Sequence, residues 1–159
     1  MWNTILETLR SEFADAPDAE QLTRLLTRLL LAALLGGMLG YERERSGKAA
    51  GIRTHMLVAI GAALFVLVPQ LGGMAVADLS RVLQGIVTGV GFLGAGAIVK
   101  HKDKPEEEVQ GLTTAAGIWM TAAIGVACGM GRESTAVLSA LLALVVLTLL
   151  PKLAGRDKS

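Results

Sequence analysis

The segment Ile86–Lys100, IVTGVGFLGAGAIVK, constrains the fold of this chain most, because it is largely apolar and crowded with glycine. Inside a soluble helix each glycine costs about 1 kcal/mol relative to alanine, so this density requires a compensating contact. In a bilayer that contact is a second helix, whose backbone approaches closely where side chains are small. The glycines of one face are Gly85, Gly89 and Gly96, and those towards other faces are Gly91 and Gly94. The segment therefore predicts a membrane helix that neighbouring helices pack against.

The composition agrees with a membrane protein. Of the 159 residues 52% are hydrophobic and 18% are charged, which is more apolar than a soluble core of this size requires. The net charge of +1 and the short, scattered basic clusters give no reason to expect nucleic acid as a partner. The single cysteine, Cys128, excludes an intrachain disulfide and a multi-cysteine zinc site. We therefore expect the lipid bilayer to surround the chain.

Five apolar runs are long enough to cross a bilayer. They are Leu25–Tyr41, His55–Leu71, Val82–Val99, Leu112–Gly129 and Thr135–Leu150. Pro69 and Pro151 are expected to stop the second and fifth helices. We predict an all-α integral membrane protein with three segments: an interfacial segment (1–23), a five-helix membrane domain (24–151) and a short cytoplasmic tail (152–159).

The basic residues predict how the chain is oriented. Ten of them fall in the first and third loops and at the C-terminal end, whereas the N-terminal segment is acidic. Because positive loops face the cytoplasm, the N-terminus should lie outside and the C-terminus inside. The inner charged motif consists of Glu42, Arg43, Glu44, Arg53 and His55. Charged groups at span ends are hydrated, so a structural anchor and a functional site are both open.

The N-terminal segment carries apolar residues at helical spacing, from Trp2 to Phe13, which predicts a helix along the outer interface, with a frayed tail as the alternative. Asp18 is placed to cap the next helix. Arg24 and Arg28 share a face four residues apart. We expect both to extend towards headgroups, and the alternative is a buried anion site.

Polar and small residues form stripes on the third and fourth spans. The candidate ion path or polar interior contains Asp78, Arg81, Gln84, Thr88, Thr113, Thr114 and Thr121. The candidate helix-packing glycines are Gly85, Gly89, Gly91, Gly94, Gly96, Gly117 and Gly125. We expect the two stripes to face each other, and Asp78 to cap the third helix and pair with Arg81. Helix packing and a wetted ion path are alternative interpretations.

The same residues limit the chemistry. Magnesium prefers oxygen ligands and gives up its waters reluctantly, yet no span carries a carboxylate near its middle. We therefore expect no dehydrated magnesium site within one chain, although Mg²⁺ as a ligand or transported ion stays open. There is no nucleophile–base arrangement or phosphate loop, so we predict neither an enzyme nor a bound cofactor.

A short motif recurs at the start of two spans. Gly51–Thr54 reads GIRT and Gly111–Thr114 reads GLTT, and an Ala-Ala pair follows each at the same offset, as Ala62-Ala63 and Ala122-Ala123. A parallel duplication of helix pairs would produce this pattern. Chance in an alanine- and glycine-rich chain is the alternative.

Several ordered motifs resemble the MgtC/SapB family of membrane proteins. They are Gly40–Glu44 (GYERE), Gly51–His55 (GIRTH), Asp78 with Arg81, Gly89–Gly96 (GVGFLGAG) and Gly111–Ala116 (GLTTAA), within a match from about Leu30 to Leu150. The resemblance implies a bacterial inner-membrane protein with five spans, associated with growth under magnesium limitation and, in some members, with survival inside host cells. It also implies ATP synthase as a membrane partner.

This sequence departs from the best-known members of that family, which continue into a soluble domain similar to ACT ligand-binding domains. Here eight residues follow Pro151, so we expect the membrane domain alone. The first functional hypothesis is a non-enzymatic protein of magnesium stress and ion homeostasis that binds a partner helix or another copy of itself. The alternatives are a magnesium or proton transporter along the third and fourth spans, and a lipid-organising scaffold. A homodimer is the simplest closed assembly.

Overall fold

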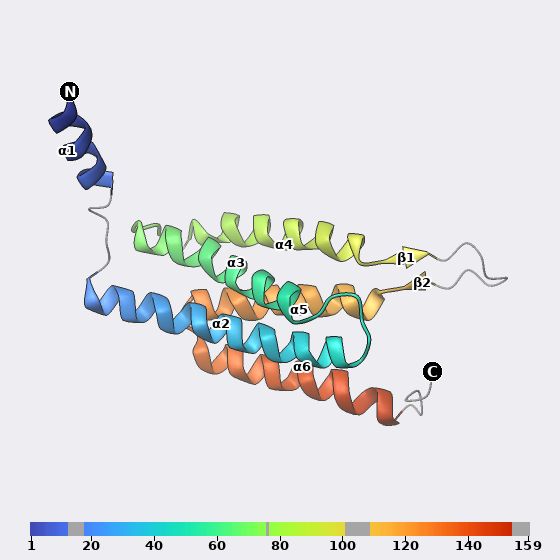
Figure 1. Cartoon of the computed structure of the whole chain (residues 1–159). Helices are drawn as coiled ribbons and strands as arrows, with labels where there is room; N and C mark the ends of the chain where they lie inside the picture. The colour runs from blue at the N-terminus through green and yellow to red at the C-terminus, as the bar shows by residue number, and fades with distance from the viewer. Residues whose placement is uncertain (13–17, 76, 101–108, 154–159) are drawn as a thin grey trace.

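The computed structural model describes residues 1–12, 18–75, 77–100 and 109–153, which form helices and one short pair of strands (Figure 1). The helices are α1 (Trp2–Glu12), α2 (Ala19–Arg45), α3 (Ile52–Leu71), α4 (Leu79–Gly96), α5 (Leu112–Gly129) and α6 (Glu133–Leu153). The strands are β1 (Val99–Lys100) and β2 (Val109–Gln110). Five helices, α2 to α6, are long and apolar enough to cross a membrane, as predicted.

The five long helices lie side by side and alternate in direction along the chain (Figure 1). The α2–α3 loop, the strands and the C-terminal end of α6 lie at one end of the bundle, which we call the inner end after the predicted orientation. The α3–α4 and α5–α6 connections lie at the opposite, outer end. The orientation in the membrane and the three segment boundaries stay predictions.

Three expectations about element ends were wrong. The third span was expected to reach Val99, but α4 ends at Gly96, and Val99 and Lys100 pair in antiparallel register with Gln110 and Val109. The sequence predicted that Val99 belongs to the third span and that Lys100, Val109 and Gln110 belong to a loop. The two prolines lie inside α3 and α6 and do not stop them. Each lies in the final turn, where its missing N–H removes a single helical hydrogen bond and little helix remains to be broken.

The N-terminal prediction is confirmed as far as the structure describes it. Residues Trp2 to Glu12 form α1, none of them buried, and the apolar side chains of Trp2 and Leu6 are exposed. Phe13 lies outside the described residues, and the interfacial location stays a prediction. The Asp18 cap is confirmed, since its Oδ1 accepts a hydrogen bond of 2.7 Å from the backbone N–H of Gln21.

The core is built around α2 and α5, which pack against each other and against both α3 and α6. The main cluster contains Ala32, Leu35, Leu39, Ala59, Ala63, Ile124, Cys128, Ala136 and Ala140. Glycines permit these contacts: a methyl group at Gly36 would lie 2.9 Å from the Cβ of Ala59, and one at Gly129 would lie 2.6 Å from the carbonyl of Ala63. Close backbone approach thus replaces large side chains in this core.

The repeated motif has a structural counterpart. Gly51 and Gly111 are the N-cap residues of α3 and α5, so each copy begins the second helix of a hairpin. Ala62 and Ala122, which correspond in the repeat, lie in the same buried cluster. The duplication itself stays a prediction.

Candidate functional site

The helix α4 presents two different faces. Its buried residues are Leu79, Val90 and Gly94, and they turn towards the bundle, where Val90 packs with Ala62 and Ile118. The helix also exposes the large apolar residues Val87, Phe92 and Leu93. Its other exposed residues towards the opposite face are small or polar. They are Arg81, Gln84, Gly85, Thr88, Gly89, Gly91, Ala95 and Gly96, which we call the outer α4 face.

Some of the predicted packing glycines contact neighbouring helices of this chain, and others contact nothing in its described part. A methyl group added at Gly85, Gly89, Gly91 or Gly96 would meet no atom within 4 Å. One at Gly94 would lie 3.6 Å from the Cβ of Ala115. In α5, Gly117 and Gly125 are buried against α3, beside His55 and Ala59 respectively. Four of the α4 glycines are therefore available for contacts outside this chain.

The polar stripes of α4 and α5 do not face each other, contrary to our expectation. Thr114 and Thr121 are buried and belong to the face of α5 that meets α3, and Thr121 donates a hydrogen bond of 2.9 Å to the Gly117 carbonyl. Thr113 is exposed. Asp78, Arg81, Gln84 and Thr88 are exposed on α4. Because Thr114 and Thr121 are buried and the other five candidate path residues are exposed, the seven do not form one continuous path.

The expected pairing of Asp78 with Arg81 was also wrong. Asp78 occupies the N-cap position of α4, but its side chain makes no capping hydrogen bond. Its backbone carbonyl accepts the N–H of Arg81 at 3.1 Å, and no ion pair joins the two side chains, both of which the structure describes. Exposure to solvent at this end explains why neither group needs the other.

The inner charged motif anchors helices. Arg43 is 3% exposed, pairs with Glu42, and donates a hydrogen bond of 3.4 Å to the carbonyl of Leu147 in α6. Glu42 also accepts a hydrogen bond of 2.9 Å from Ser46. Glu44 accepts the backbone N–H of Ile52 at 3.0 Å and so satisfies a free donor at the start of α3. Arg43 and Glu44 thus connect α2 to α6 and to α3.

His55, in the same motif, is completely buried, whereas Arg53 is exposed. The His55 Nδ1 lies 3.0 Å from the Gly51 carbonyl, which fixes this nitrogen as the donor. Its Nε2 has no hydrogen-bond partner and lies beside Gly117, whose missing side chain makes room for the ring. The position of His55 at a span end gave no sign of this burial.

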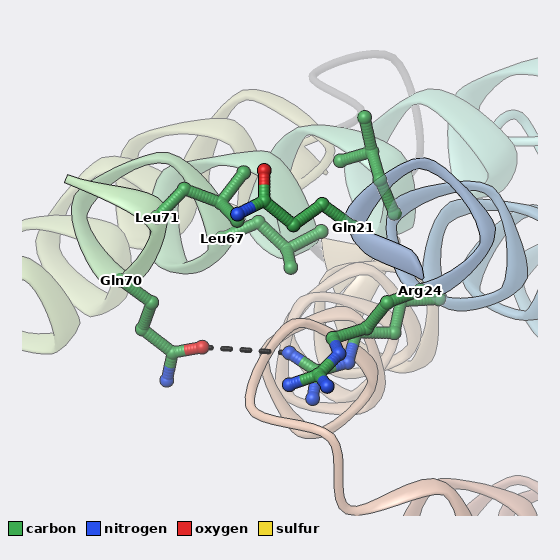
Figure 2. A pocket seen from close by; sticks show the side chains of 7 residues that line it. Gln21, Arg24, Leu67, Gln70 and Leu71 are labelled. Atoms are coloured by element: carbon green, nitrogen blue, oxygen red, sulfur yellow. Dashed lines mark hydrogen bonds between the residues drawn. The ribbon is translucent and has the colours of Figure 1, made fainter. Parts of the chain in front are cut away.

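Arg28 was expected to extend towards headgroups, and this was wrong. Its side chain is 16% exposed and turns into the outer end of the bundle. Its Nη1 donates hydrogen bonds of 3.0 Å to the Gly129 carbonyl and 3.5 Å to Gln70 Oε1, the second of which Figure 2 shows. Its Nε lies 3.7 Å from Glu133. The orphan carbonyls at the C-terminal end of α5 attract this cation inward.

Arg24 behaves as expected: its side chain is 55% exposed and pairs at 2.7 Å with Glu20. The two arginines border a cavity of about 140 Å³ between the outer ends of α2 and α3 (Figure 2). A second, apolar groove of about 230 Å³ runs between α4 and α5, past Val87 and Trp119. Within the described residues no group of three or more His, Cys, Asp or Glu could hold a metal ion.

Comparisons with known proteins agree with the sequence motifs. The sequence model of the MgtC family matches residues 29–156. "Protein SrpB" of Synechococcus elongatus is 50% identical over 102 residues, which cover 58% of this chain and 56% of that protein. "Putative magnesium transporter YhiD" of Escherichia coli K12 is 41% identical over 125 residues, covering 74% of this chain and 56% of YhiD.

"Protein MgtC" of Brucella abortus is 44% identical over 112 residues, covering 70% of this chain and 45% of that protein. The chain thus spans about half the length of the curated relatives it matches. No solved structure matches. The five apolar helices and the family match together identify a multi-pass bacterial membrane protein that belongs to the MgtC family.

Proposed function

We propose that this chain serves magnesium homeostasis, and growth at low magnesium in particular, through helix–helix contact in the bilayer. The outer α4 face is the contact surface, and a second copy of the chain is the partner. Support for the magnesium role comes from the relatives, one of which has the name "Putative magnesium transporter YhiD". Support for the contact comes from α4.

The observation that carries the proposal is the density of small and polar residues among the exposed residues of α4. Lipid-facing surfaces favour large apolar side chains, as on α6, where Leu141, Leu142 and Val145 are exposed. On α4 Leu79 and Val90 are buried against the bundle, while the exposed residues are mostly glycine, threonine and glutamine beside three large apolar side chains, Val87, Phe92 and Leu93. Small residues gain nothing from lipid but permit close helix contact. The outer α4 face is therefore suited to another helix.

A second copy fits this face because its features are self-complementary. Gly85 and Gly89 form a Gly-x-x-x-Gly pattern, which allows two identical helices to cross closely. The Gln84 amide has no hydrogen-bond partner in the described part of the chain, and an amide both donates and accepts, so it can pair with its own copy across a two-fold axis. Phe92 follows one turn later and is exposed, so it is available to pack against the second copy.

Co-purification of differently tagged copies tests the contact. Gly89→Leu should abolish it, because leucine prevents the close crossing. The matched control is Gly61→Leu in α3, where an added Cβ atom also meets nothing within 4 Å. Growth in magnesium-limited medium should fail with Gly89→Leu and persist with Gly61→Leu. Retained co-purification with Gly89→Leu, or capture of a different protein such as ATP synthase in place of a second copy, would contradict the proposed partner.

Magnesium or proton transport is the second candidate function, and the polar character of the outer α4 face favours it. Because Thr114 and Thr121 lie in the core and Gln84 and Thr88 lie outside it, the route would run between two copies along α4. Thr88→Leu should then abolish magnesium or proton flux into liposomes that contain purified protein. Absence of flux with folded wild-type protein would exclude transport and leave the contact proposal intact.

A further inference from the structure

We propose that the cavity between the outer ends of α2 and α3 binds the phosphate group of a phospholipid. Its polar lining consists of Gln21, Arg24, Arg28 and Gln70, two arginines and two amides (Figure 2). Leucines of both helices complete the wall. The site is separate from the outer α4 face and does not depend on the proposed function.

The surroundings of Arg28 are short of acceptor oxygens. Its guanidinium bonds to the Gly129 carbonyl and to Gln70, but its buried Nε has no hydrogen-bond partner. Glu133 lies 3.7 Å away, too far for a hydrogen bond, and is partly exposed. A phosphate in the cavity supplies several strong acceptors for the N–H groups of the lining side chains. Arg28 therefore forms a fixed wall of the cavity, and Glu133 is its ion-pair partner outside the lining.

Arg24 supplies a guanidinium that can exchange its ion-pair partner. Its partner Glu20 is 80% exposed, and a surface ion pair of this kind contributes only about 0–1 kcal/mol. Arg24 can therefore exchange the carboxylate for a phosphate oxygen at little cost. The planar guanidinium fork matches phosphate geometry, and the amide groups of Gln21 and Gln70 add further N–H donors. The two nearby acidic groups, Glu20 and Glu133, do not line the cavity.

The position of the cavity favours a lipid as the source of the phosphate. It lies at the ends of two candidate spans, the depth at which headgroups meet the hydrocarbon region. Leu25, Leu67 and Leu71 line it beside the polar groups, so the site offers apolar surface next to cationic donors. A phospholipid, with a phosphate joined to acyl chains, has the same arrangement.

Native mass spectrometry of the purified full chain with added phosphatidylglycerol tests this site. Arg24→Gln should weaken lipid binding about tenfold, as expected when one charge-assisted hydrogen bond is lost, while sparing the fold because Arg24 is exposed. Gln21→Leu should weaken it less. Arg132→Gln is the matched control, since Arg132 is an exposed arginine at the same end and does not line the cavity.

A parallel titration with inorganic phosphate separates the two sources. Lipid binding that depends on Arg24 but not on Arg132 supports the phospholipid site. Phosphate binding with the same dependence, in the absence of lipid binding, supports the anion site and assigns it to free phosphate. Equal binding by the wild type and Arg24→Gln, or equal weakening by Arg132→Gln, would overturn the proposal.

Discussion

The Arg28 guanidinium donates a hydrogen bond of 3.0 Å to the Gly129 carbonyl, 101 residues later in the chain. It thereby connects the first half of α2 to the end of α5, and through Gln70 to the end of α3. One partly buried cation thus joins three spans at the outer end, while Arg43 joins α2 to α6 at the inner end.

Replacing Arg28 with glutamine should lower the free energy of unfolding in detergent by about 2–3 kcal/mol, because charge-assisted hydrogen bonds to buried partners are lost. Arg24→Gln should change it by less than about 1 kcal/mol. Thermal unfolding followed by circular dichroism compares the two. Equal stability of Arg28→Gln and the wild type would show that Arg28 does not anchor the helices.

The strength of the Glu42–Arg43 pair should appear in a double-mutant cycle. Glu42→Gln alone leaves a buried cation without its counter-ion and should cost about 3 kcal/mol. Arg43→Met combined with Glu42→Gln should cost clearly less than the sum of the single changes. Additive losses of unfolding free energy would mean that the two side chains act independently.

Substitution of Gly131 should lower the free energy of unfolding for two reasons. Its φ of +70° disfavours any residue with a side chain, and a methyl group there would overlap the Arg28 guanidinium. Gly73 has a φ of +77° but meets nothing within 4 Å, so it isolates the backbone effect. Gly73→Ala should cost about 1 kcal/mol and Gly131→Ala clearly more, measured by thermal unfolding. Equal losses would refute the contact with Arg28.

The close approach of α3 and α5 gives another prediction. Gly125→Ala should destabilise the protein, because the new methyl group overlaps the Ala59 carbonyl and separates the helices. Gly61→Ala should be neutral or stabilising by up to about 1 kcal/mol, since alanine favours the helix and meets nothing there. If the two variants unfold at the same temperature, the described packing of α3 on α5 is incorrect.

The five spans could be predicted from the sequence because long apolar runs suffice in a bilayer, and Leu112–Gly129 was predicted to the residue. The partners of each helix could not. Gly125 and Gly89 look alike in sequence, since small residues indicate that a contact occurs but not with which helix. Arg24 and Arg28 also share a face, yet only Arg28 lies near the free carbonyls of α5. Such differences depend on which neighbouring helix each face meets and on where along it that neighbour ends, which local spacing does not encode.

The central claim is that α4 meets a second α4, and disulfide crosslinking in native membranes tests it most directly. In a Cys128→Ala background, Thr88→Cys places a thiol of similar size on the outer α4 face, and Leu142→Cys places one on the exposed face of α6. Mild oxidation should yield covalent dimers for Thr88→Cys in clear excess over Leu142→Cys, and adding Gly89→Leu should abolish that excess. Equal crosslinking at both positions, or an excess that survives Gly89→Leu, would contradict the account.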